Sequence, residues 1–113
     1  MYTRTIIVEG KSDKERLLRV LAEPVTIICT HGSYSSVKSE QLLNRIPISS
    51  DVYIFTDEDE SGMKLRAQLR EDFPDAIHLH TKKNFAQVAN TPVVDLAEIL
   101  QKAGFLVKET KSA

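Results

Sequence analysis

The segment DVYIFTDEDESGMKLR, residues 51–66, decides how this chain of 113 residues is expected to fold. Its apolar start, DVYIF, is typical of a buried strand, and its last residues begin a helix that ends before Pro74. Between the strand and the helix, four consecutive residues carry carboxylates, Asp57 to Glu60. Carboxylates this close repel one another unless water screens the repulsion or a cation neutralises the charge. The segment therefore predicts a strand, an acidic turn and a helix, with the turn either solvated or bound to a cation.

Similar strand and helix signals recur along the rest of the chain. Short, largely apolar runs predict three further strands, at 5–8, 25–29 and 76–80. Three further helices are predicted within 9–24, from about 37 to 45, and from 92 to 103. Strands that alternate with helices at this spacing form βαβ units. We therefore predict an α/β fold with three layers, α/β/α, around a four-stranded parallel sheet ordered 2-1-3-4, as in Rossmann-like proteins.

The ends of two helices carry recognisable capping signals. Ser12 and Glu15 match the S-x-x-E capping box at the start of the first helix. Thr91 is the expected N-cap of the last helix, Pro92 its first residue and Gly104 its C-cap. Residues 105–108 are predicted to form a short additional strand at the end.

Composition indicates one ordinary globular domain, residues 1–113, with a tail from about 109 that we expect to be disordered. Hydrophobic residues make up 42% of the chain and charged residues 27%. No apolar run is long enough for a membrane span, and the N-terminus does not read as a signal peptide, so a cytoplasmic location is expected. A net charge of −1 provides no general attraction to nucleic acid. Such binding would need local basic clusters or a metal ion.

Acidic residues follow two strands that the expected order makes neighbours. Glu9 comes directly after the first strand, and Asp57 lies just after the third. Ligands of open parallel sheets bind at the carboxyl ends of strands flanking the point where the strand order reverses. Glu9 and Asp57 should therefore meet there, with Asp59 pointing to the same side. Three carboxylates around one crevice suit magnesium, with manganese as a plausible substitute.

The motifs VEGKSD (8–13) and TDEDESG (56–62) together resemble those of the Toprim domain family. This family occurs in topoisomerases, bacterial primases, overcoming-lysogenization-defect nucleases and a ribonuclease that matures ribosomal RNA. The resemblance extends over nearly the whole chain and implies magnesium-dependent phosphoryl transfer on RNA or DNA, with nuclease-like cleavage expected. It assigns a general acid or base role to Glu9 and metal binding to Asp57 and Asp59. The tyrosine nucleophile and nucleotide-binding region of the larger enzymes come from other domains.

Further residues near the motifs are candidates for supporting roles. Three basic side chains are candidates for phosphate contact: Lys11, His31 and Arg66. For Arg66 the prediction is an exposed basic helix face shared with Lys64 and Arg70. Three other residues are candidates for positioning the carboxylates without binding the metal themselves: Gly10, Asp13 and Gly62.

Two other functions fit the same pattern. A phospho-receiver domain has a similar length and fold, and Asp57 would be its phosphate acceptor. That alternative lacks a second acid beside Glu9 and does not explain Asp59 or Gly62. The chain could also be a Toprim-shaped module that binds metal and nucleic acid but needs a partner protein for catalysis. The sequence leaves homo-oligomerisation open as well.

Overall fold

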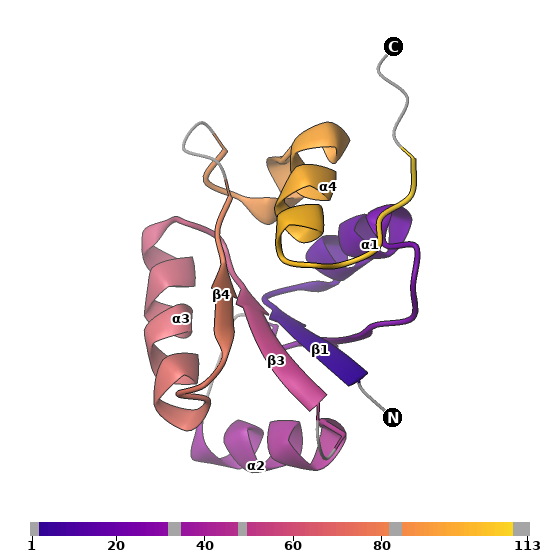
Figure 1. Cartoon of the computed structure of the whole chain (residues 1–113). Coiled ribbons are helices and arrows are strands. Elements are labelled where there is room, and N and C mark those ends of the chain that lie inside the picture. Colours follow the sequence, from indigo (N-terminus) through magenta and orange to yellow (C-terminus); the bar gives the residue numbers. More distant parts are fainter. Residues whose placement is uncertain (1–2, 32–34, 48–49, 82–84, 110–113) are drawn as a thin grey trace.

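The computed structural model describes residues 3–31, 35–47, 50–81 and 85–109 (Figure 1). Within these ranges strands and helices alternate along the chain. The strands are β1 (Thr3–Val8), β2 (Thr26–Cys29), β3 (Ser50–Phe55) and β4 (Ile77–Leu79). The helices are α1 (Lys11–Val20), α2 (Ser36–Arg45), α3 (Glu60–Asp72), the 3₁₀ turn η1 (Val88–Asn90) and α4 (Val93–Lys102).

The four strands form one sheet in the order β2-β1-β3-β4, with every neighbouring pair parallel. Val8 pairs with Cys29, and Ile7 pairs with Ile54, so the strands end close to the same level. The predicted fold class and strand order are confirmed. β1 and β3 are neighbours in the middle of the sheet, and their carboxyl ends flank the point where the order reverses.

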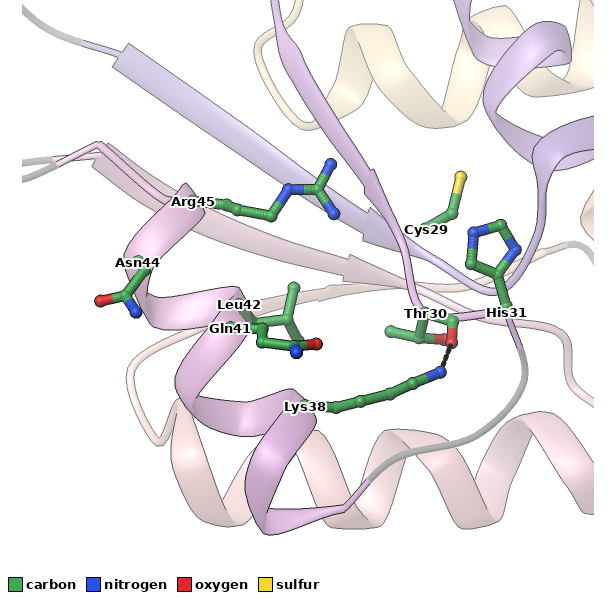
Figure 2. Close-up of a pocket in the computed structure, with 8 residues that line it drawn as sticks. All are labelled: Cys29, Thr30, His31, Lys38, Gln41, Leu42, Asn44 and Arg45. Atoms are coloured by element: carbon green, nitrogen blue, oxygen red, sulfur yellow. Dashed lines mark hydrogen bonds between the residues drawn. The ribbon is translucent and has the colours of Figure 1, made fainter.

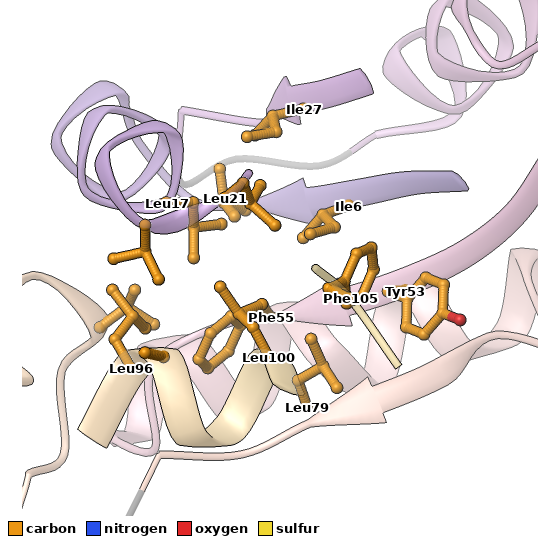
Figure 3. Close-up of a cluster of buried hydrophobic side chains, with 14 residues drawn as sticks. Ile6, Leu17, Leu21, Ile27, Tyr53, Phe55, Leu79, Leu96, Leu100 and Phe105 are labelled. Atoms are coloured by element: carbon orange, nitrogen blue, oxygen red, sulfur yellow. The ribbon is translucent and has the colours of Figure 1, made fainter. Parts of the chain in front are cut away.

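Apolar side chains cover both faces of the sheet, which explains the continuous apolar runs in the strands. Successive residues of β1 point to opposite faces: Ile6 and Val8 join one core, and Ile7 joins the other. The first core packs α1 and α4 against the sheet through residues such as Leu17 and Leu96 (Figure 3). The second core lies beneath α2 and α3 on the opposite face. The molecule therefore has the three layers predicted from the sequence.

The segment after α4 adds side chains to the first core but does not form the predicted strand. Val107 makes a single antiparallel bridge to Leu21, so the expectation of a strand at 105–108 is wrong. Phe105 instead packs edge-on against Tyr53, with 4.7 Å between the ring centroids (Figure 3). The Arg4 guanidinium lies over the Phe105 ring, 4.8 Å from its centroid. The predicted disordered tail lies mostly outside the described residues.

The helix ends differ in part from the capping predictions. Gly10, rather than Ser12, is the N-cap of α1, and the Asp13 carboxylate accepts a hydrogen bond from its backbone N–H. Pro92 is the N-cap of α4, whereas Thr91 lies one residue earlier and donates its hydroxyl to a backbone carbonyl. Gly104 follows the C-cap of α4 with a φ of 94°, a left-handed conformation that glycine adopts without strain. Among the described residues, no helix combines the length and apolar character needed to cross a membrane.

Candidate metal centre

Three carboxylates converge at the carboxyl ends of β1 and β3. Glu9 follows β1, while Asp57 and Asp59 belong to the turn between β3 and α3. One oxygen from each of the three side chains lies within 4.8 Å of the other two, and all three residues are half-buried. The structure therefore brings together the three residues that the sequence suggested as ligands and proton carrier.

A hydrogen bond fixes the position of Glu9 relative to the acidic turn. The backbone N–H of Asp57 donates to Oε1 of Glu9 over 2.8 Å. Burial raises the pKa of Glu9 above its ordinary value, and the nearby charges of Asp57 and Asp59 raise it further, against the effect of this hydrogen bond. Glu9 thus holds a proton more readily than an exposed glutamate does.

Backbone N–H groups also orient the two aspartates. Oδ1 of Asp57 accepts a hydrogen bond of 2.8 Å from the N–H of Val88 in η1. Asp59 is the N-cap of α3, and its Oδ1 accepts from the N–H of Gly62, also over 2.8 Å. Burial raises the pKa of Asp57, and the charges of Asp59 and Glu58 add to this rise. Each carboxylate has a second oxygen that it can offer to a cation.

Gly62 allows α3 to start directly against the carboxylates. A Cβ atom at this position would lie 2.1 Å from the carbonyl oxygen of Asp57 and 2.7 Å from Oε1 of Glu9. Both distances are far below van der Waals contact. Gly62 is therefore required by close approach rather than by an unusual backbone conformation.

Arg66 does not form the exposed basic face predicted with Lys64 and Arg70. Arg66 is only 3% exposed, because its guanidinium enters the space between the ends of β3 and β4. It donates to three backbone carbonyls and to the Glu58 carboxylate, with the shortest bond, 2.7 Å, to the carbonyl of Leu79. Arg66 thus holds the acidic turn in place from within.

The other sequence candidates lie around the same end of the sheet. Asp13 is buried, and its bond to the N–H of Gly10 shapes the turn that follows Glu9. Burial raises the pKa of Asp13, and the charge of Asp57 contributes to the rise. Lys11 is exposed at the start of α1. His31 is exposed at the end of β2 and has a φ of 59°, an uncommon value for a residue with a side chain.

Sequence reasoning missed two contributions to this site. The N–H of Val88 orients Asp57, but a backbone donor in a 3₁₀ turn has no side-chain signature. Glu58, which was not among the candidate residues, accepts one hydrogen bond from Arg66 and pairs with His80 at 2.6 Å. The alternation of His78 in β4 and His80 just after it was the available signal for a polar network beside the turn.

The residues present fit a hard divalent cation. The donor set consists of carboxylate oxygens, which suit magnesium and manganese, and like charges crowd around the same point. Burial is the main cause of the raised pKa values of Glu9 and Asp57, and the neighbouring negative charges, which a bound cation would offset, add to it. The fold and the centre together define an α/β protein with an acidic site at the switch point of its sheet that could hold a metal ion.

Comparison with known proteins agrees with this class. The Toprim domain family model matches residues 4–90, and the chain belongs to this family. A solved structure described as a small TOPRIM domain protein from Bacillus stearothermophilus superimposes with a TM-score of 0.88 at 42% identity. The matched region covers 96% of this chain and 91% of the chain in that structure.

The curated relatives fall into two groups. The uncharacterized protein YusF of Bacillus subtilis (strain 168) is 45% identical over 104 residues, which are 92% of this chain and 70% of YusF. Ribonuclease M5 of Mycoplasma genitalium is 27% identical over 94 residues, 83% of this chain and 51% of that protein. Ribonuclease M5 of Mycoplasma capricolum is 36% identical over 61 residues, 54% of this chain and 34% of that protein. The matches thus span only about a third to a half of these ribonucleases.

Proposed function

We propose that this protein binds magnesium, or manganese in its place, and uses it for phosphoryl transfer on nucleic acid, with nucleolytic cleavage as the reaction. The convergence of Glu9, Asp57 and Asp59, with ligand atoms within 4.8 Å of one another, carries the proposal. The names of the ribonuclease M5 relatives support RNA as a substrate to test first.

The three carboxylates have different roles in this proposal. Asp57 and Asp59 hold the cation, each oriented through one oxygen by a backbone N–H. When bound, such a cation neutralises charge on the phosphate and polarises its phosphorus–oxygen bonds. Glu9 exchanges a proton with the attacking or leaving oxygen. Its raised pKa suits that role, because a general acid or base works best with a pKa closer to the working pH.

A cleavage assay with matched variants tests the proposal. The substrates are structured RNA, single-stranded DNA and double-stranded DNA, each with magnesium, with manganese and with excess chelator. Glu9→Gln retains an amide oxygen that can accept the N–H of Asp57, so the fold and the metal affinity should persist while turnover is lost. Glu71→Gln, an exposed glutamate near the end of α3, is the control for loss of one charge. Cleavage by Glu9→Gln at the wild-type rate would exclude the proton-transfer role.

A second candidate is a module that binds metal and nucleic acid but needs a partner protein or a second copy for catalysis. It is favoured by one observation: the ribonuclease M5 relatives are two to three times as long as the segment that they share with this chain. Metal-dependent nucleic-acid binding without cleavage of any substrate would support this candidate. The phospho-receiver alternative is set aside, because the chain belongs to the Toprim family.

A further inference from the structure

Two hollows adjoin at the carboxyl end of β2, one strand away from the three carboxylates. One hollow, of about 400 Å³, lies between β2 and α2 (Figure 2). The other, of about 420 Å³, lies between β2 and α1. Cys29, His31 and Arg45 line both, so we treat the pair as one groove, called here the β2-end groove.

Positive charge dominates the lining of the β2-end groove. Lys38 and Arg45 come from α2, and Lys11 and Lys14 come from α1. Among the described residues of the lining, Glu15 is the one acid. The whole chain has a net charge of −1, so this cluster of positive side chains is a local feature of the groove. The groove therefore attracts anions beside a centre that attracts cations.

The charges of both helices act on the same point of the groove floor. Burial raises the pKa of the Cys29 thiol and the charge of Asp13 adds to this rise, while the positive charges of Lys14 and Arg45 oppose it. Figure 2 shows Lys38 and Arg45 extending from α2 towards the end of β2, where Cys29 and His31 lie. Cations from α1 and α2 thus approach the end of β2 from its two sides.

Local structure holds the floor of the groove in a defined shape. The ammonium group of Lys38 donates to the carbonyl oxygen of Thr30 over 2.9 Å (Figure 2). His31 follows in the left-handed conformation, with a φ of 59°, and its ring lines both hollows. Unusual backbone conformations of non-glycine residues tend to occur where a side chain must be placed for binding.

The groove lies directly beside the candidate metal centre. The N–H of Thr30 donates to the carbonyl of Val8 over 3.0 Å, which places the end of β2 next to the strand that leads into Glu9. Neighbouring strands of a sheet are about 4.8 Å apart. A polymer whose phosphate reached the carboxylates would therefore have its adjoining residues within reach of the groove cations.

We propose that the β2-end groove binds the sugar–phosphate backbone of the substrate strand, with Lys38 and Arg45 contacting a phosphate that flanks the one at the carboxylates. This assignment rests on the proposed function, because it takes nucleic acid as the substrate. A groove lined by cations from two helices is suited to following a polymer backbone. The groove supplies affinity and direction along the strand, and the acidic centre supplies the chemistry.

Binding measurements on two pairs of charge variants test this assignment. Labelled single-stranded RNA and DNA of one sequence are titrated with protein in magnesium over a series of salt concentrations, with fluorescence anisotropy as readout. The groove variant is Lys38→Gln with Arg45→Gln; the control is Lys64→Gln with Arg70→Gln, two exposed residues of α3. We expect the groove variant to bind about 10-fold more weakly, with a salt slope lower by about 1 to 2, and the control to change little.

Arg45→Gln alone is measured as well, because Lys38 also has a structural hydrogen bond to Thr30. Weakened binding with an unchanged melting temperature in this variant would assign the loss to the groove. Equal losses in the α3 control and the groove variant would overturn the proposal, because only total charge would then matter. Failure of the wild type to bind either oligonucleotide would overturn it too.

Protection of Cys29, the only cysteine of the chain, locates the bound strand independently of catalysis. The rate of its modification by a maleimide is followed in Glu9→Gln protein, with and without saturating oligonucleotide. We expect bound oligonucleotide to slow modification several-fold. An unchanged rate would reject the groove but not cleavage at the carboxylates. Protection in a protein that cleaves nothing would reject the proposed reaction but keep the groove.

Discussion

The backbone N–H of Asp57 donates a hydrogen bond of 2.8 Å to Oε1 of Glu9, which links the carboxyl ends of β1 and β3. Glu9 is therefore positioned by the backbone of the residue whose carboxylate is proposed to bind the metal. The same contact places the two negative charges close together, and each pKa is raised mainly by burial.

Asp57→Asn should abolish the stabilisation of the protein by magnesium. The asparagine oxygen can still accept the N–H of Val88, so the variant removes a charge but keeps the hydrogen bond. Without metal it should be as stable as the wild type or more stable, because repulsion with Asp59 is relieved. At a magnesium concentration ten times its Kd, the wild type should gain about 1.4 kcal/mol. Thermal melts of both proteins with and without magnesium measure the metal-free stability and the stabilisation by magnesium.

The control for this experiment is Asp75→Asn, which removes a charge from an exposed turn away from the centre. It should respond to magnesium as the wild type does. Equal magnesium responses of wild type and Asp57→Asn would place the ion elsewhere. Clear destabilisation of metal-free Asp57→Asn would make Asp57 a structural residue of the turn.

Gly62→Ala should both destabilise the protein and impair the centre. The added methyl group would meet the backbone of Asp57 and the carboxylate of Glu9, neither of which can move without disturbing the hydrogen bond between them. We expect a loss of about 1–3 kcal/mol in unfolding free energy and a weaker response to magnesium. Ser61→Ala, at the exposed neighbouring position, should cost little. Chemical denaturation with and without magnesium measures both effects. If Gly62→Ala has the unfolding free energy and magnesium response of the wild type, the close approach at Gly62 is ruled out.

Arg66→Met should be among the most destabilising single changes at this end of the sheet. Methionine can fill part of the space, but the carbonyls of Thr56 and Leu79 would lose a buried donor. We expect a loss of about 3 kcal/mol. Arg70→Met, on the exposed side of the same helix, is the matched control and should change stability by less than about 0.5 kcal/mol. Similar denaturation midpoints for the two variants would contradict the role of Arg66.

Much of this site followed from sequence because topology constrains it strongly. Once strands and helices alternate, the sheet is parallel, and the residues after β1 and β3 must lie at one edge. That rule alone brings Glu9 close to Asp57. The sequence pattern could not place Arg66, because its burial depends on unpaired carbonyls at the ends of two strands rather than on its own helix. Charged residues are mostly exposed, so a solvated helix face was the natural expectation.

The N-cap of α1 shows a similar limit of local rules. Ser12 and Glu15 have the spacing of a capping box, yet α1 starts earlier, with Asp13 bonded to the N–H of Gly10. The early start brings the first turn of α1 against the end of β1 and shapes the turn after Glu9. Packing at the sheet edge thus outweighs a capping preference, which is typically about 1 kcal/mol.

The network beside the acidic turn includes a titratable group, His78. Nδ1 of His78 lies 3.1 Å from the Arg66 guanidinium; since arginine can only donate, this nitrogen is the acceptor and carries no proton. Burial lowers the pKa of His78 from its ordinary value of 6.5, and the positive charges of Arg66 and Arg70 lower it further. Below pH 6.5, the ordinary pKa, the histidine of the unfolded chain therefore takes up a proton more readily than that of the folded protein.

The contribution of His78 to stability is therefore present above pH 6.5 and is lost as the pH falls through the folded-state pKa. His78→Asn keeps an acceptor for Arg66 but does not titrate. Between about pH 8 and about pH 5, its unfolding free energy should fall less than that of the wild type, with the difference appearing only on the acid side. Denaturation at a series of pH values measures this difference, and NMR titration of the His78 ring gives the folded-state pKa directly. Parallel pH profiles for the two proteins, or a ring pKa above 6.5, would show that protonation of His78 does not oppose folding.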